Sequence, residues 1–301
     1  MGVSLLVLFI LVYLCGALSM AFFTLLERKV LGYMQLRKGP NKVAIMGLAQ
    51  PFADVMKLFT KEQSGPSFSN IGVFLVSPIF GLMLALFIWS FFPSSYPAFF
   101  AILTSVVFIC ISSLNVYGTL LAGWSSNSKY ALLGSLRAIA QTISYEVSMA
   151  LIFLSVLSLH EILELNQMFS SGFYIMFFLL PVACVWLITC LAETNRTPLD
   201  LAEGESEIVS GFNVEYSAAP LAFILMAEYM NVIFMSVLTA TVLVGVTYTL
   251  MATFWSVVLV YSFVWVRGSL PRMRYDKLMA LTWKSFLPMS LMVFMLAMPV
   301  S

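Results

Sequence analysis

Two acidic residues stand out because each lies inside a long apolar stretch. Glu146 and Glu228 fall well within segments of helical length, and a rise of 1.5 Å per residue places both near the middle of a membrane. A charge at that depth costs at least ~2.5 kcal/mol, so such acids usually serve an ion or proton pathway. Tyr145 and Tyr229 are their neighbours and could extend a hydrogen-bonded chain. A pair of neutral acids hydrogen-bonded between helices is the alternative.

A second group of acids is concentrated in one polar segment, ETNRTPLDLAEGESEIVSGFNVEY at residues 193–216. Its acids are Glu193, Asp200, Glu203, Glu205, Glu207 and Glu215, and its one basic residue is Arg196. A solvated acidic loop is one interpretation. The glycines and apolar residues between the acids favour a folded segment that packs against partner proteins. Glu193, which follows an apolar stretch directly, could join the pathway of the two membrane acids.

Cofactor chemistry has no visible residues in this chain. The cysteines lie in apolar stretches and form no C-x-x-C pair, so their spacing supports neither a zinc site nor an iron–sulfur cluster. The single histidine, His160, excludes a bis-histidine haem, and with Glu161 and Glu164 it predicts an ordinary outer loop. Neither glycine-rich nucleotide-binding motif occurs. We therefore expect no metal or redox cofactor in this chain.

The composition indicates that most of this chain lies in a lipid membrane rather than in water. Of the 301 residues, 61% are hydrophobic and 10% are charged, and the mean hydropathy is +0.99. No charged residue occurs from Gln63 to Ser128. Such a chain cannot cover itself with polar surface, since soluble domains contain about 25% charged residues. A net charge of +1 also argues against a nucleic-acid binder.

The chain is predicted to be an all-α polytopic membrane protein that forms a single membrane domain, residues 1–301. A membrane helix needs roughly 20 apolar residues, and eight stretches meet that length. They are residues 3–26, 69–92, 98–122, 130–157, 172–193, 217–240, 246–266 and 278–299, with the acidic loop at 194–216. The boundary between the sixth and seventh spans is the least marked.

Residues 41–61 are too polar to span a membrane, yet they have a helical period. Apolar side chains share one face (Leu48, Phe52, Val55, Met56, Phe59), and polar side chains share the other (Gln50, Asp54, Lys57, Lys61). This pattern predicts an amphipathic helix in the membrane interface. The helix is either a simple surface anchor or one wall of a lateral opening for a lipid-like substrate, and periodicity alone does not choose between them.

The basic residues predict the orientation. All 15 lie in or beside the four connections that follow the odd-numbered spans, so these connections should face the cytoplasm or matrix and both termini the opposite side. No targeting signal precedes the first span, which indicates insertion by that span in a bacterium or an organelle. The 19 methionines and 26 phenylalanines are compatible with a mitochondrial genome.

Five stretches resemble the family of NADH dehydrogenase subunit 1, the quinone-chamber membrane subunit of respiratory complex I, in its mitochondrial form. They are LLERKVLGYMQLRKGPNKV at 25–43, QPFADVMKLFTKE at 50–62, SNSKYALLGSLRAIAQTISYEV at 126–147, LAETNRTPLDLAEGESEIVSGFNVEY at 191–216 and PRMRYDKLMALTWKSFLP at 271–288. The bacterial counterpart is the H subunit of NADH-quinone oxidoreductase. The chain departs from the family pattern at Ala44-Ile45, which replaces Gly-Pro, at Leu199, which replaces Phe, and in a short loop after the sixth span.

The resemblance implies that ubiquinone enters from the bilayer between the first span, the surface helix and the sixth span. The residues implied for this entrance and its chamber are Glu27, Arg28, Phe52, Asp54, Arg196, Glu203, Glu205, Glu207, Glu215, Arg272 and Arg274. The residues implied for a proton path are Tyr145, Glu146, Glu193, Asp200, Glu228 and Tyr229. Spans two to six are implied to resemble an antiporter half-channel.

The resemblance also implies the partners and the location. Ubiquinone would be the substrate, while NADH, FMN and the iron–sulfur clusters would belong to other subunits of a proton-translocating NADH:ubiquinone reductase. Partners would be the peripheral-arm subunits, including the one with the terminal iron–sulfur cluster, small membrane subunits such as subunits 3 and 6, and membrane lipids. The chain would span the mitochondrial inner membrane, with both termini on the intermembrane-space side.

Two other functions are compatible with membrane acids. A stand-alone cation/proton secondary transporter also holds such acids, but transporters often have internal repeats, and none is visible here. The homologous subunit of a membrane-bound hydrogenase would share the acidic motifs without reducing ubiquinone. Purification in mild detergent distinguishes a stand-alone transporter from a subunit of a larger enzyme, since a transporter would purify and act as a lone chain.

Overall fold

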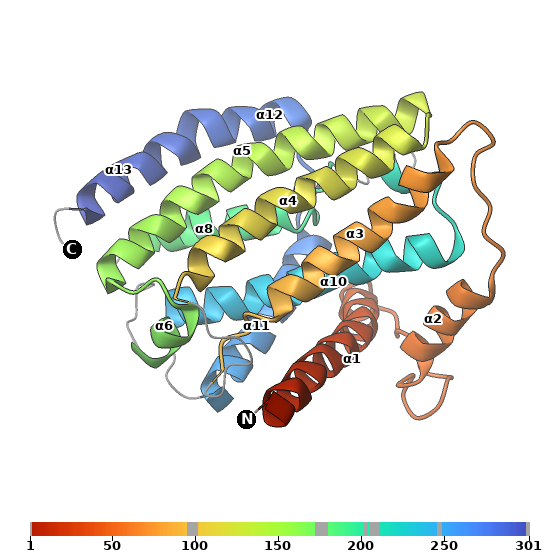
Figure 1. The fold of residues 1–301 in the computed structure, drawn as a ribbon, viewed down its shortest axis with the longest axis horizontal. Coiled ribbons are helices and arrows are strands. Elements are labelled where there is room, and N and C mark those ends of the chain that lie inside the picture. The colour runs from red at the N-terminus through yellow and green to blue at the C-terminus, as the bar shows by residue number, and fades with distance from the viewer. Residues whose placement is uncertain are drawn as a thin grey trace.

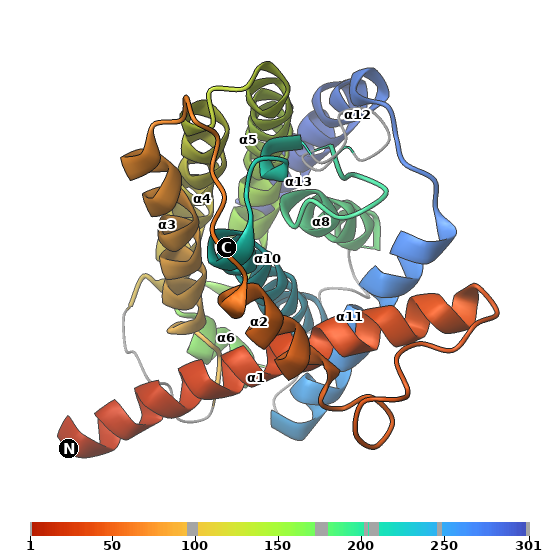
Figure 2. The same cartoon turned by 90° about the vertical axis from the view of Figure 1, so that its right-hand side faces the viewer.

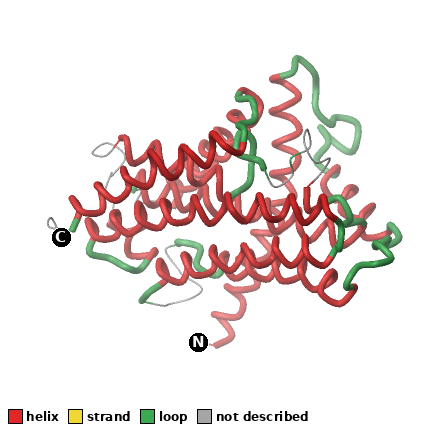
Figure 3. Tube along the Cα trace, turned by 90° about the horizontal axis from the view of Figure 1, so that it is seen from above, coloured by secondary structure: helices red, strands yellow, loops and turns green. Residues whose placement is uncertain are grey.

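The computed structural model describes residues 2–94, 102–171, 180–201, 204, 211–245 and 249–298. Every regular element among these residues is a helix (Figures 1 and 3). The all-α class predicted from hydropathy is therefore confirmed for the described part of the chain.

Seven helical runs are long and apolar enough to cross a membrane. They are α1 (Gly2–Met34), α3 (Ile71–Trp89), α4 (Thr104–Ser125), α5 (Lys129–His160), α10 (Ala218–Thr239) with the π-helical turn η2 (Ala240–Val244), α11 (Thr249–Ser269), and α12 (Tyr275–Leu281) with the π-helical turn η3 (Thr282–Phe286) and α13 (Leu287–Ala297). Of the remaining expected span, 172–193, the structure describes α8 (Leu180–Glu193), a shorter apolar helix. Two further elements are short, α6 (Leu165–Ser171) and the 3₁₀ turn η1 (Gly211–Asn213).

The polar segment between the first two spans folds into turns followed by a helix. Residues 42–49 form turns, and α2 (Gln50–Thr60) begins with Pro51 in its first turn, where a missing N–H costs nothing. Ala44 has a φ of 54°, a left-handed conformation that glycine adopts more readily. The departure at Ala44 that the resemblance indicates therefore coincides with a strained turn. Phe52, Met56 and Phe59 are exposed on α2.

The helices pack around α10 and α5. Helix α10 contacts α1, α2, α3 and α11, while α5 contacts α4, α8 and the α12–α13 run. Figure 2 views most of the bundle nearly end-on, and α1 runs across its lower side with α2 beside it. Large side chains fill the interior, including those of Phe108, Phe153, Trp186 and Phe234. This packing brings the polar residues of several helices into the interior.

Candidate functional site

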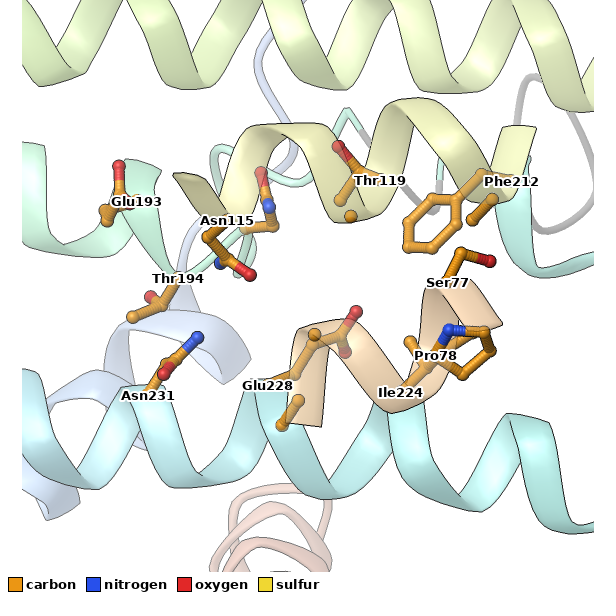
Figure 4. Close-up of a pocket in the computed structure, with 15 residues that line it drawn as sticks. Ser77, Pro78, Asn115, Thr119, Glu193, Thr194, Phe212, Ile224, Glu228 and Asn231 are labelled. Carbon is orange, nitrogen blue, oxygen red and sulfur yellow. The ribbon is translucent and has the colours of Figure 1, made fainter. Parts of the chain in front are cut away.

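A cavity of about 60 Å³ with several polar lining residues lies between α3, α4, α10 and the end of α8. Its polar lining residues are Ser77, Asn115, Thr119, Glu193, Thr194, Asn195, Glu228 and Asn231. Figure 4 shows Glu228 and Asn231 pointing from α10 into the space beside Asn115 and Thr194. Two acids that sequence reasoning assigned to one pathway, Glu193 and Glu228, therefore share one cavity.

A second cavity, of about 20 Å³, adjoins the first between α3, α4, α8 and α10. It shares Asn115, Glu193 and Asn231 with the first cavity and adds Ser112 among its lining residues. The Ser112 hydroxyl donates a hydrogen bond of 3.5 Å to Glu146 Oε1. Polar groups thus connect Glu228 through Glu193 to Glu146.

The carboxyl group of Glu193 occupies the middle of this series. Its Oε2 atom is buried and accepts no hydrogen bond from the described residues, and the same holds for Asn231 Oδ1. Glu193 also interacts electrostatically with Glu146, so a negative charge on one opposes a negative charge on the other. A buried carboxyl group with a free oxygen and an acidic neighbour is suited to bind and release a proton.

The end of α8 that holds Glu193 is fixed from α5. The side chain of Gln141 is fully buried, and its Nε2 donates hydrogen bonds to the carbonyl oxygens of Ala192, at 3.2 Å, and of Leu199. Backbone carbonyls beyond a helix end need such donors when they are buried. Gln141 therefore positions both Glu193 and the segment that follows it.

A charged cluster centred on Glu27 lies on another face of α10. Glu27 is buried, its Oε1 accepts a hydrogen bond from Arg267, and Arg196 Nη1 lies 3.6 Å from the same oxygen. The Tyr229 hydroxyl donates a bond of 2.9 Å to Glu27 Oε2, and the Arg196 guanidinium stacks 4.5 Å from the Tyr229 ring centre. The cluster joins α1, α10, α11 and the segment after α8.

A further cavity, of about 110 Å³, lies between α1, α2 and α10. Its lining is mainly apolar, with Arg28, Asp54 and Tyr229 among its polar members. Arg28 Nη1 lies 2.5 Å from Asp54 Oδ2, and this ion pair ties α1 to α2. Phe52 does not line the cavity. Its ring packs edge-on against Phe22, with ring centres 6.2 Å apart, and holds α2 against α1.

The remaining predicted residues belong to the segments that follow α8 and α11 in the sequence. Asp200 is buried and pairs with Arg272 at 2.8 Å, so it belongs to an ion pair between segments rather than to the cavity of the acids. Arg274 is exposed and pairs with Asp276 at 3.0 Å. Glu215 is half-buried beside Tyr216. Glu203, Glu205 and Glu207 lie outside the described residues.

The two predicted tyrosines differ in their surroundings. Tyr229 follows Glu228 in sequence but bonds to Glu27 instead. Tyr145 is fully buried, its hydroxyl has no hydrogen-bond partner among the described residues, and its ring lies 6.3 Å from that of Phe286. Sequence adjacency to an acid therefore did not indicate the tyrosine's partner.

Sequence reasoning missed several residues that complete these sites. Arg267 enters the sequence argument only as one of the 15 basic residues that predict the orientation, although it donates a hydrogen bond to Glu27 across 240 residues of sequence. Asn115, Asn231 and Ser112 link the acids, and their one sequence signal is a polar side chain inside an apolar stretch. No cluster of three or more histidine, cysteine, aspartate or glutamate residues within the described ranges is arranged to hold a metal ion.

Comparison with known proteins identifies the family of this chain. Residues 6–298 match the family model for NADH dehydrogenase. The chain is 54% identical over 285 residues to the NADH-ubiquinone oxidoreductase chain 1 of Aedes aegypti, covering 94% of this chain and 91% of that protein. It is 52% identical over 293 residues to that of Locusta migratoria, with the same coverages, and 50% identical over 288 residues to that of Balaenoptera physalus, covering 92% and 91%. The chain therefore belongs to the NADH dehydrogenase family.

Proposed function

We propose that this chain is the membrane subunit of NADH-ubiquinone oxidoreductase, respiratory complex I, that admits ubiquinone and couples its reduction to proton translocation. The family and the names of the relatives support membership of the enzyme, and the matches extend over most of both chains. The chain would span the mitochondrial inner membrane eight times, with α2 in the interface and both termini toward the intermembrane space.

The cavity between α1, α2 and α10 supports a role as the quinone entrance. Its apolar lining, which includes Met20, Leu58 and Leu225, suits an isoprenoid tail. Arg28 and Tyr229 supply hydrogen-bond donors for the carbonyl oxygens of a quinone ring. The two expectations for the surface helix, anchor and wall, both agree with this arrangement, because the Arg28–Asp54 pair anchors α2 where it borders the cavity.

Glu228, Glu193 and Glu146 would form the beginning of the proton path. They line or adjoin two cavities that share Asn115, Glu193 and Asn231. Asparagine amides and the Ser112 hydroxyl can donate or accept hydrogen bonds, so they can order water between the acids. Protons would move between the carboxyl groups by way of such water.

The proposed coupling between the quinone cavity and the acids rests on one observation. The segment from Glu193 to Arg196 contributes Glu193, Thr194 and Asn195 to the cavity of the acids, while Arg196 reaches the Glu27 cluster. Tyr229 belongs to that cluster and also lines the quinone cavity. A change of charge in the quinone cavity would therefore act on Arg196, and through it on the position of Glu193.

Partner subunits with FMN and iron–sulfur clusters would supply the electrons. The residues of this chain would bind the quinone, hold Arg196 between Glu27 and Tyr229, and keep Glu193 next to Glu146 until the charge near the cluster changes. Proton uptake by the reduced quinone would then alter the balance of charge at Glu27 and Arg196. The acids in the adjoining cavities would respond by exchanging protons.

A photoreactive ubiquinone analogue tests the entrance in the enzyme purified with mild detergent. We expect the chain to co-purify with NADH-oxidising subunits and to be labelled on peptides of α1, α2 or α10. Excess ubiquinone should suppress the label. A chain that purifies alone and transports ions, or labelling that excess ubiquinone does not reduce, would contradict the proposal.

A further inference from the structure

Lys284 is a basic residue on the outward face of a helical run that can cross a membrane. It lies in the π-helical turn η3, seven residues beyond Lys277, which places it about 10 Å deeper along the helix. Its side chain is exposed, and so are those of Trp283 and Ser285 on either side. Single π-helical turns within α-helices are frequent at functional sites.

The described part of the chain offers Lys284 no acidic partner. The nearby ion pairs join Arg272 to Asp200 and Arg274 to Asp276. The α12–α13 run packs against α5 at the edge of the bundle, so its other side is open (Figure 1). A lysine costs about 2.5–3.5 kcal/mol at the centre of a membrane helix and less toward its ends, and its flexible stem recovers part of this cost by reaching toward the headgroups. A negative charge opposite Lys284 would remove the rest.

The residues that continue this face resemble a protein interface more than a lipid surface. Met289, Met292, Met295 and Met298 are all exposed, and each is three residues from the next, so neighbouring methionines adjoin in a stripe that winds around α13 by about 60° per step. Methionine and tryptophan are enriched in the cores of protein interfaces, and methionine adapts its shape to a partner. Trp283 and this stripe flank the charge.

Helix α11 provides the contrast. Its exposed side chains include Phe254, Val257, Tyr261 and Trp265, and no charged residue occurs between Thr249 and Val266. An uncharged apolar surface of this kind needs only lipid. The outward faces of α11 and of the α12–α13 run therefore differ in charge. The α12–α13 face carries a lysine, which lipid tails cannot neutralise, and the α11 face carries no charged residue from Thr249 to Val266.

We propose that the face formed by Trp283, Lys284, Ser285 and the methionine stripe is a subunit interface. Its occupant is a membrane helix of another subunit that carries an aspartate or glutamate at the depth of Lys284. The inference rests on the proposed membership of a multi-subunit enzyme, but not on the quinone entrance or the proton path. An anionic lipid would satisfy the charge only by drawing its headgroup about 10 Å below Lys277.

Site-specific photo-crosslinking in the assembled enzyme identifies the occupant. A photoreactive amino acid at Ser285 should give one discrete protein adduct, and mass spectrometry should map it to a membrane helix that contains an acidic residue. The matched control is the same probe at Phe254 on α11, where lipid adducts should predominate. Lipid adducts alone at Ser285, or an adduct to a helix without an acid, would overturn the inference.

Charge exchange then tests the pairing. Lys284→Arg should assemble like the wild type, while Lys284→Glu should lower the amount of assembled enzyme at least about tenfold, because like charges would face each other in the membrane. Since Lys284→Glu could also hinder insertion, the partner's acid is changed to lysine in the same cells. Restored assembly supports the pair, whereas an unrestored double variant, or wild-type assembly of Lys284→Glu, rejects it.

The two proposals fail in different ways. A chain that co-purifies with NADH-oxidising subunits but gives only lipid adducts at Ser285 rejects the interface alone. A chain that purifies without any other subunit rejects both.

Discussion

Arg196 lies 3.6 Å from the carboxylate of Glu27 and stacks over the ring of Tyr229, which bonds to the same carboxylate. Because Arg196 is three residues beyond Glu193, this contact joins the cavity of the acids to the cavity between α1, α2 and α10. Two cavities, one lined by the acids Glu193 and Glu228 and the other by Arg28 and Tyr229, are thus linked by a single charged cluster.

Removing Arg267, which donates a hydrogen bond to the buried Glu27, should destabilise the chain. Arg267→Met leaves the buried Glu27 with less compensation, and breaking a buried ion pair from one side costs roughly 3 kcal/mol. We expect a clear loss of thermal stability of the assembled enzyme. Glu27→Gln in the same chain should recover much of the loss, and a double variant no more stable than Arg267→Met would contradict the pairing.

The control for that variant is an exposed pair. Arg274→Met breaks the contact with Asp276, and both side chains are largely exposed. Exposed ion pairs contribute about 0–1 kcal/mol. Its thermal transition should therefore stay close to that of the wild type.

Changes at the proposed entrance should impair quinone reduction selectively. Arg28→Ala removes a donor and the ion pair to Asp54, and Phe52→Ala removes the ring that packs on Phe22. We expect the KM for a ubiquinone analogue to rise several-fold, with NADH oxidation by artificial peripheral acceptors nearly unchanged. Arg37→Ala, which loses only an exposed contact to Gln35, is the control. Wild-type quinone activity per assembled enzyme would show that both residues merely anchor α2.

The two outer acids of the series should be needed for turnover rather than for assembly. Glu146→Gln and Glu228→Gln keep the shape and the hydrogen-bonding capacity but cannot exchange a proton. Assembly should be retained, while quinone reductase turnover should fall by about 10²-fold, the lower end of the usual contribution of a positioned acid or base. Glu146→Ala should do further structural damage because it removes side-chain volume beside Ser112, whose hydroxyl keeps the Ile109 carbonyl oxygen as an acceptor. If both glutamine variants turned over like the wild type, the acids would be structural.

The predicted orientation is open to chemical labelling. Lys61 and Lys277 are exposed and should face the matrix, so cysteines placed there should react only after the inner membrane is opened. Arg196 lies in a connection assigned to the same side, but it is buried and cannot serve as a reporter. Labelling of Lys61→Cys or Lys277→Cys from the intermembrane-space side of intact mitoplasts would overturn the topology.

Hydropathy predicted the helical class because the cost of unpaired backbone in lipid is local and appears in any window of about 20 residues. The pairing of side chains from different helices, in contrast, depends on residues that are far apart in the sequence. The bond between Arg267 and Glu27 and the bond between Tyr229 and Glu27 depend on how α1, α10 and α11 pack, and no short motif records that packing. The grouping of Glu193 with Glu228 was predictable, because an acid inside an apolar stretch must find polar neighbours. The asparagines that line the shared cavity were not, since an uncharged amide produces a weaker signal.

Glu193→Gln in sealed vesicles tests the coupling proposal most directly. Glu193 lines both internal cavities and stands next to the segment that reaches the Glu27 cluster. The measurement is proton pumping and quinone turnover per assembled enzyme, with the exposed Glu161→Gln as the matched control. We expect Glu193→Gln to assemble, to lose pumping and turnover together, and to keep NADH oxidation by artificial peripheral acceptors. A Glu193→Gln enzyme that pumps and turns over like Glu161→Gln would show that no proton passes through this position.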